Sequence, residues 1–128
     1  MSKLKPKVLV IEDDLFYQRI LNDKLSRAGF SVVSALDGEE GLKLLLKDKP
    51  DLLVLDIRIP KIDGITLLNK IREMDNWGQR LPVIVITAMP DFALESFEKS
   101  TNQKHTYFYQ KTQTKIKDII DKALKLVN

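Results

Sequence analysis

The sequence contains no cysteine and only one histidine and one tryptophan. Without cysteine the chain has no disulfide bond, no thiol nucleophile and no thiolate metal site. Its apolar runs, such as Leu52–Leu55 and Val83–Ile86, are far shorter than the roughly 20 residues that cross a bilayer. The basic start Met1–Lys7 is not followed by the apolar core of a signal peptide, so we expect a cytoplasmic protein that does not contact a membrane.

The composition is that of one ordinary globular domain, which we assign to residues 1–128. Hydrophobic residues make up 44% and charged residues 30% of the chain. The net charge of +3 is too small to indicate nucleic-acid binding. The aromatic cluster Tyr107–Tyr109 could stack on bases, but its flanks favour a buried strand, so we expect no direct contact with nucleic acid.

Short apolar runs alternate along the chain with longer patterns of helical spacing. The predicted strands are 8–11, 30–33, 52–55, 82–86 and 107–109. The predicted helices are 15–28, a segment that opens at 37 or 38 and closes at Pro50, 65–74, 92–99 and 116–127. Strands that are apolar throughout, each followed by a helix, are typical of a doubly wound α/β domain whose parallel sheet is covered on both faces. Ligands of such sheets bind at the carboxyl ends of the strands.

Polar side chains follow four of the five predicted strands. They are Glu12, Asp13 and Asp14 after the first, Asp56 after the third, Thr87 (with the small Ala88 beside it) after the fourth, and Lys111 after the fifth. Since the carboxyl ends of parallel strands share one edge of the sheet, we expect these groups to converge.

Converging carboxylates predict a divalent metal. Two like charges about 4 Å apart repel by roughly 4 kcal/mol at an effective dielectric constant near 20. A Mg²⁺ ion, which prefers oxygen ligands, removes this repulsion and keeps water positions open for a phosphate. The Asp56 carboxylate can then act as a nucleophile toward phosphorus. Lys111 and the Thr87 hydroxyl can hold the phosphoryl oxygens.

Several of these residues also have ordinary interpretations. Asp14 is expected to cap the following helix. Glu12 and Asp13 could be plain loop carboxylates, but their predicted proximity to Asp56 and Lys111 favours the metal site. His105 is expected to be a surface or packing residue.

Four sequence blocks resemble the response-regulator receiver domain of two-component signalling. They are VLVIEDD at 8–14, DLLVLDIRIPKIDG at 51–64, VIVITA at 83–88, and the later Lys111. The middle block is the most specific, with Asp56 after an apolar strand, Pro60 four residues on, and Asp63–Gly64 closing the loop. The resemblance covers essentially the whole chain and implies a flavodoxin-like sheet of strand order 2-1-3-4-5 with five helices.

The resemblance also implies a function. Asp56 would be phosphorylated by a sensor histidine kinase or a histidine phosphotransfer protein, and Mg²⁺ would be held by Glu12, Asp13, Asp56 and the backbone carbonyl of Arg58. Asp13 would be a direct ligand. The phosphoryl-binding and switch residues would be Thr87, Ala88, Lys111 and Phe108. The domain would be a signalling switch, a phosphoprotein that catalyses only its own phosphotransfer and dephosphorylation. It would act on a downstream protein target, as a monomer or a phosphorylation-dependent dimer.

The chain departs from the family after the fifth strand. Thr112 follows Lys111 where the family has proline, and the register leaves Tyr107 or Tyr109 as alternatives to Phe108. A pseudo-receiver that binds partners without phosphorylation is therefore the alternative function. A third hypothesis is a metal-dependent phosphohydrolase that uses Asp56 as nucleophile. Such an enzyme usually has a second aspartate two residues later, where this chain has Arg58.

Overall fold

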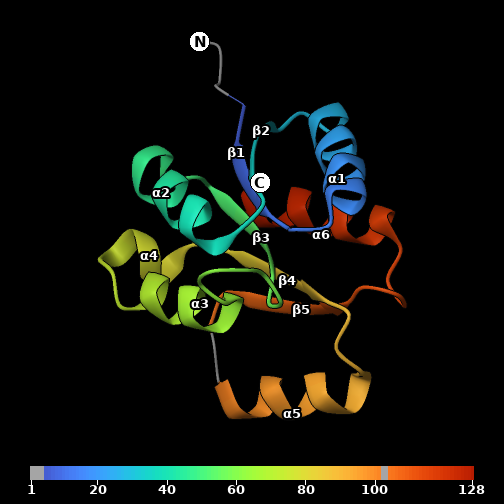
Figure 1. The fold of residues 1–128 in the computed structure, drawn as a ribbon. Coiled ribbons are helices and arrows are strands. Elements are labelled where there is room, and N and C mark those ends of the chain that lie inside the picture. The colour runs from blue at the N-terminus through green and yellow to red at the C-terminus, as the bar shows by residue number, and fades with distance from the viewer. Residues whose placement is uncertain (1–4, 102–103) are drawn as a thin grey trace.

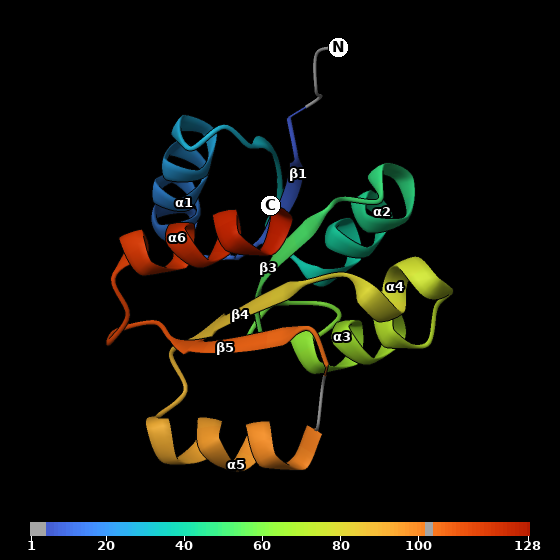
Figure 2. The ribbon, with the colours of Figure 1, turned by 180° about the vertical axis from the view of Figure 1, so that it is seen from behind.

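The computed structural model describes residues 5–101 and 104–128. One sheet of five parallel strands has the order β2-β1-β3-β4-β5 (Figures 1 and 2). The strands are β1 (Lys7–Ile11), β2 (Ser31–Ala35), β3 (Leu52–Asp56), β4 (Val83–Thr87) and β5 (Thr106–Gln110). The helices are α1 (Leu15–Arg27), α2 (Gly38–Asp48), α3 (Gly64–Arg72), α4 (Asn76–Arg80), α5 (Asp91–Thr101) and α6 (Ile116–Val127). The doubly wound α/β fold and its strand order are confirmed.

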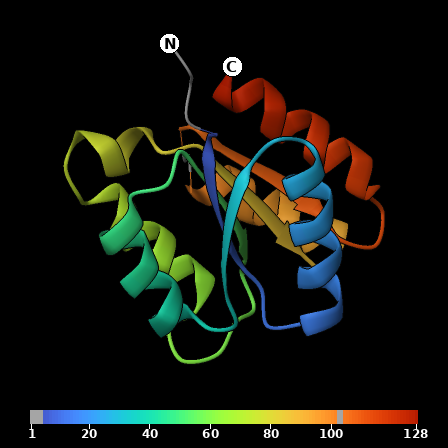
Figure 3. The ribbon, with the colours of Figure 1, turned by 90° about the horizontal axis from the view of Figure 1, so that it is seen from above.

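The sheet is covered on both faces, which explains why its central strands are apolar at every position. Seen from above, α1 and α6 lie on one face and α2 and α3 on the other (Figure 3). Side chains of β3 alternate between the two layers: Leu53 and Leu55 pack with α2 and α3, and Leu52 and Val54 pack with α1 and α6. Because both sides of such a strand are buried, its sequence does not alternate between apolar and polar residues.

The described part of the chain has six helices, one more than the five that the sequence predicts. The additional helix α4 has only five residues, and its segment DNWGQ appears in the sequence as a loop. The Asp75 side chain caps it by accepting from the amide of Gly78. Gly78 is required by packing, since a Cβ there would lie 2.4 Å from the carbonyl oxygen of Ile71. So short a helix shows no periodicity that a sequence pattern could reveal.

Aspartate side chains begin two helices that follow the strands β1 and β3. Asp14 accepts hydrogen bonds from the amides of Phe16 and Tyr17, which confirms it as the cap of α1. Asp63 accepts from both the amide and the hydroxyl of Thr66 at the start of α3. Each cap satisfies amide groups that have no partner within the helix. Both helices therefore start at a defined place relative to the strand end before them.

The chain changes its winding direction between β1 and β3, which pair in parallel with Ile11 opposite Leu55. This is the switch point at which doubly wound sheets bind ligands. In this register the residues that follow, Glu12 and Asp56, lie side by side at the carboxyl edge. In residues 5–101 and 104–128 no helix combines the length and apolar character that crossing a bilayer requires.

Candidate functional site

Three carboxylates converge at the carboxyl edge of β1 and β3. Glu12, Asp13 and Asp56 each place an oxygen within 4.8 Å of the others. Glu12 is fully buried and Asp56 is 5% exposed, whereas Asp13 is exposed to solvent. The cluster is therefore anchored in the protein on one side and open on the other.

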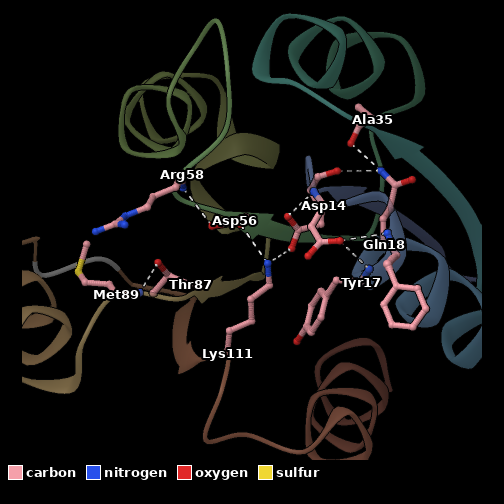
Figure 4. A network of polar contacts seen from close by, with 11 residues as sticks. Asp14, Tyr17, Gln18, Ala35, Asp56, Arg58, Thr87, Met89 and Lys111 are labelled. Atoms are coloured by element: carbon pink, nitrogen blue, oxygen red, sulfur yellow. Dashed lines mark hydrogen bonds and ion pairs between the residues drawn. The ribbon is translucent and has the colours of Figure 1, made fainter.

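Lys111 is the cation that faces these carboxylates (Figure 4). Its Nζ lies 3.3 Å from Oδ2 of Asp56 and forms a second ion pair with Oε1 of Glu12. Burial acts to lower the pKa of Lys111, but the hydrogen bond to Glu12 and the negative charge of Asp56 outweigh it, so the pKa is raised. Lys111 is therefore charged at neutral pH.

Glu12 is held at the base of the cluster. Burial raises its pKa to about 7, and hydrogen bonds from Lys111 and from the Asp14 amide oppose the shift. The Asp14 amide donates to Oε2 over 3.0 Å. The buried Gln18 side chain, from α1, donates to the backbone carbonyls of Glu12 at 3.1 Å and Ala35 at 2.8 Å. These bonds hold the loop after β1 against the end of β2.

The Asp56 carboxylate is oriented by its own loop. Its Oδ1 accepts from the amide of Arg58 over 3.0 Å. Further along this loop, the amide of Gly64 donates to the carbonyl of Ile57 over 2.8 Å. A Cβ on Gly64 would lie 2.5 Å from Cα of Ile57, so this close approach requires glycine. The loop that starts at Asp56 thereby returns to the strand end.

The end of β4 supplies Thr87, whose side chain is fully buried. Its Oγ1 accepts from the amide of Met89 over 3.1 Å, and its carbonyl accepts from the amide of Lys111 over 2.7 Å. Because the Thr87 oxygen accepts from Met89, this bond does not use the hydroxyl hydrogen. Ala88 is exposed beside it.

The turn that presents Lys111 is stabilised without proline. Oε1 of Gln110 accepts from the hydroxyl of Thr112 over 2.7 Å and from the amide of Gln113 over 2.9 Å. Residues 5–101 and 104–128 contain no cis peptide bond, so the bond between Lys111 and Thr112 is trans. The hydrogen bonds to the Gln110 side chain thus stabilise the turn at a position where Thr112, unlike proline, does not restrict the backbone.

The aromatic residues of β5 lie on opposite faces of the sheet. Phe108 is paired with Val85 and packs against the core layer beneath α2 and α3. Tyr109 packs against the layer beneath α1 and α6, and the Nζ of Lys122 lies 4.1 Å from the centre of the Tyr107 ring. Phe108 therefore points away from α6, whereas its two neighbours face it.

Two residues of α1 belong to the site but carry no functional prediction from the sequence. Gln18 bonds the loop after β1, and the Tyr17 ring lies beside Lys111. A signal for Gln18 is present: it precedes the buried Leu21 and Leu25 by three and seven residues, so a polar side chain occupies the core-facing stripe. Tyr17 lies three residues after Asp14, in the first turn of α1, and nothing in its sequence position distinguishes it from an ordinary residue of an amphipathic helix.

The donor set fits Mg²⁺. All three side chains offer carboxylate oxygens, which this ion prefers, and an octahedral ion with bonds of about 2.1 Å holds opposite ligands about 4.2 Å apart. The 4.8 Å spread of the carboxylate oxygens is close to that span. Buried Glu12 and Asp56 share one ammonium, so negative charge exceeds positive charge in the cluster. The exposed side at Asp13 leaves room for water ligands.

The chain belongs to the response regulator receiver domain family, whose model matches residues 8–126. Over 86 residues, 67% of this chain and 36% of the relative, it is 44% identical to the transcriptional regulatory protein AfsQ1 of Streptomyces coelicolor. The chain spans about a third of the length of the curated relatives it matches.

Solved structures share the fold. The receiver domain of the Francisella response regulator 1452 superimposes with a TM-score of 0.82 at 28% identity, covering 95% of this chain and 96% of that one. The receiver domain of the sensor histidine kinase PA1611 from Pseudomonas aeruginosa gives a TM-score of 0.79 at 24% identity, covering 96% and 98%. That structure holds a magnesium ion in its active-site cleft, and at this identity the likeness shows the fold alone.

Proposed function

We propose that this domain is a phosphoacceptor switch of two-component signalling, with Asp56 as the acceptor and Mg²⁺ as the cofactor. The observation that carries the proposal is the buried carboxylate of Asp56 beside Glu12 and Asp13, with Lys111 as the ammonium that faces it. A sensor histidine kinase or a histidine phosphotransfer protein would be the donor.

In the proposed reaction a carboxylate oxygen of Asp56 attacks phosphorus. A P–O bond forms, the bond from phosphorus to the donor's nitrogen or oxygen breaks, and its electron pair leaves with the donor. The product is an acyl phosphate on Asp56. When bound by Glu12, Asp13, Asp56 and the Arg58 carbonyl, Mg²⁺ supplies positive charge that offsets the charge on the transferring group.

The residues around Asp56 have distinct parts in this reaction. The Arg58 amide holds Oδ1 of Asp56 and so orients the carboxylate. Lys111, 3.3 Å from Oδ2, is within reach of a phosphoryl oxygen placed there. The Thr87 hydroxyl donates to another oxygen, and the small, exposed Ala88 leaves the acceptor accessible.

Phosphorylation would act by shifting a pre-existing equilibrium of the face formed by α5, β5 and α6, which carries Phe108. Lys111 and Thr87 connect that face to the acceptor, because the Lys111 amide donates to the Thr87 carbonyl at the ends of β5 and β4. The proposed partner of this face is a protein target, with the domain as a monomer or a phosphorylation-dependent dimer. AfsQ1 is a transcriptional regulatory protein, so control of transcription is a proposed output of signalling through this domain.

The test is intact-mass analysis after incubation with Mg²⁺ and acetyl phosphate. We expect a mass gain of one phosphoryl group that requires Mg²⁺ and is absent from the Asp56→Asn variant. Asp63→Asn is the matched control, since Asp63 lies in the same loop but caps α3. No gain in any of these samples, beside a control receiver domain that is modified, would support a pseudo-receiver instead. Sustained turnover of a phosphomonoester would indicate a phosphohydrolase.

A further inference from the structure

The Tyr17 ring provides Lys111 with an uncharged partner. Nζ of Lys111 lies 4.4 Å from the centre of the Tyr17 ring, within the distance of a cation–π contact. In Figure 4 the ring, from α1, lies beside the lysine that reaches up from the end of β5. The ammonium is thus surrounded by the carboxylates of Asp56 and Glu12 and by this ring.

The hydroxyl of Tyr17 does not explain why a tyrosine lies here. Its oxygen is buried and has no hydrogen-bond partner among the described residues. Burial also raises the pKa of Tyr17 to about 12, so the hydroxyl stays neutral. A buried hydroxyl without a partner is unfavourable. The favourable part of this side chain is therefore its ring, which offers Lys111 the negative face of an aromatic quadrupole.

We propose that Tyr17 is a positioning residue that keeps the Lys111 ammonium at the acceptor carboxylate. The inference rests on the proposed function and concerns the stage at which the carboxylates cease to hold the lysine. A metal ion bound by Glu12 and Asp56 competes with Lys111 for the same oxygens, and phosphorylation removes one oxygen of Asp56 from the pair. The ring neither binds the metal nor changes its charge, so its attraction for the ammonium persists.

The lysine needs such a partner at that stage because, once its ion pairs with Glu12 and Asp56 are lost, only its backbone is fixed. The Lys111 amide is held by the Thr87 carbonyl at 2.7 Å, but a flexible four-carbon stem separates the ammonium from that anchor. Contact with a ring on α1 restricts the stem from the opposite side of the site. Of two conformations, facing the acceptor or facing solvent, the ring favours the first.

The first test uses the unphosphorylated protein and so does not depend on the proposed function. An aromatic face shifts the resonances of protons above it upfield, so we expect an upfield shift of the Lys111 ε-protons in the NMR spectrum. The shift should persist in Tyr17→Phe, which keeps the ring. It should disappear in both Tyr17→Leu and Tyr17→Met, two independent variants that remove the ring. Tyr107→Leu, which removes the ring beneath Lys122, should leave it unchanged. An unshifted Lys111 in the parent protein would overturn the inference while leaving the acceptor role of Asp56 intact.

The second test measures how fast phosphorylated protein accumulates with Mg²⁺ and acetyl phosphate. We expect Tyr17→Leu to be slower by about three- to tenfold, the factor that a cation–π contact of ordinary strength gives, and Tyr17→Phe to match the parent. In a Lys111→Met background, Tyr17→Leu should cause no further loss, because the ring acts through the lysine. Equal rates in Phe and Leu variants, or the same Leu effect without Lys111, would overturn the inference. If the parent itself accepts no phosphoryl group, the proposed function fails. The NMR result alone then shows whether the Tyr17 ring holds the Lys111 ammonium.

Discussion

The two edges of the sheet differ in how their charged side chains are surrounded. At the amino ends of β4 and β5, the half-buried Arg72 donates to the carbonyls of Gly78 and Leu81 at 2.8 Å each, to that of His105 at 3.2 Å, and to the hydroxyl of Thr106 at 2.8 Å. At the carboxyl ends, three carboxylates lie close together, and two of them, those of Glu12 and Asp56, pair with the one ammonium of Lys111.

The difference is that Arg72 is surrounded by neutral acceptors, whereas the carboxylates lie beside like charges. Burial lowers the pKa of Arg72, but neutral acceptors surround both of its terminal nitrogens, so the guanidinium joins α3, α4, β4 and β5. The carboxylates instead lie close to one another, and their mutual repulsion favours binding of a cation. Stability is therefore expected to depend on Arg72, and ligand binding on the acidic cluster.

The largest expected effect on stability is that of Arg72→Met. Removing the guanidinium leaves several partly buried carbonyls without a donor, which should lower the free energy of unfolding by about 3 kcal/mol. Urea denaturation measures the change. Arg80→Met, at an exposed position of the same edge, should change stability by less than about 0.5 kcal/mol. Equal effects of the two variants would contradict the structural role of Arg72.

Magnesium should stabilise the domain by a similar amount. At a concentration about 100 times its dissociation constant, a ligand that binds only the folded state adds about 2.7 kcal/mol to the free energy of unfolding. We expect this gain on addition of MgCl₂, its reversal by a chelator, and its loss in Asp56→Asn. Potassium chloride of equal ionic strength is the control, since general screening would act in both salts.

Without metal, Asp56→Asn should increase the free energy of unfolding by about 1 kcal/mol, because it removes repulsion from Glu12 and Asp13. Lys111 keeps its ion pair with Glu12 in this variant. Thermal or urea unfolding in a chelating buffer measures the change. Asp23→Asn, which removes a carboxylate from an exposed ion pair, should have almost no effect. Destabilisation by Asp56→Asn would mean that the pair with Lys111 outweighs the repulsion.

An effect of comparable size is expected for Asp63→Ala, which removes the cap of α3 and should lower the free energy of unfolding by about 1 kcal/mol at neutral pH. Hydrogen bonds from Thr66 lower the pKa of Asp63 below its ordinary value of 3.8. A depressed folded-state pKa contributes stability that is present above the unfolded value and lost as the pH falls through the folded one. The stability difference between parent and variant should therefore shrink in acid. A difference that is independent of pH would contradict the role of the charged cap.

The fold and the location of the site could be predicted because both depend on short-range patterns. Each central strand is an apolar run that ends at a polar residue, as Leu55 is followed by Asp56. In a parallel sheet these ends must meet, so the grouping of Glu12, Asp13, Asp56, Thr87 and Lys111 follows from topology. The helix α6 was equally predictable, since its apolar stripe is continuous and its observed bounds match the expected 116–127.

Other features depend on close packing or on contacts between distant segments, and neither has a sequence pattern. The short helix α4 forms because Gly78 fits against Ile71, and Arg72 finds its acceptors 33 and 34 residues away at His105 and Thr106. The contact of Tyr17 with Lys111 likewise joins α1 to the end of β5. Phe16, which fits the apolar spacing of α1, is 76% exposed, because that helix buries only one stripe.

The most direct test of the central claim is to locate the phosphoryl group on the chain. After phosphorylation with Mg²⁺ and acetyl phosphate, borohydride reduces an aspartyl phosphate to an alcohol, and peptide mass spectrometry identifies the altered residue. We predict a single modification, at Asp56, that disappears when magnesium is removed. Modification of Asp13 or Thr87 in place of Asp56, or labelling that does not require magnesium, would contradict the assignment of Asp56 as the acceptor.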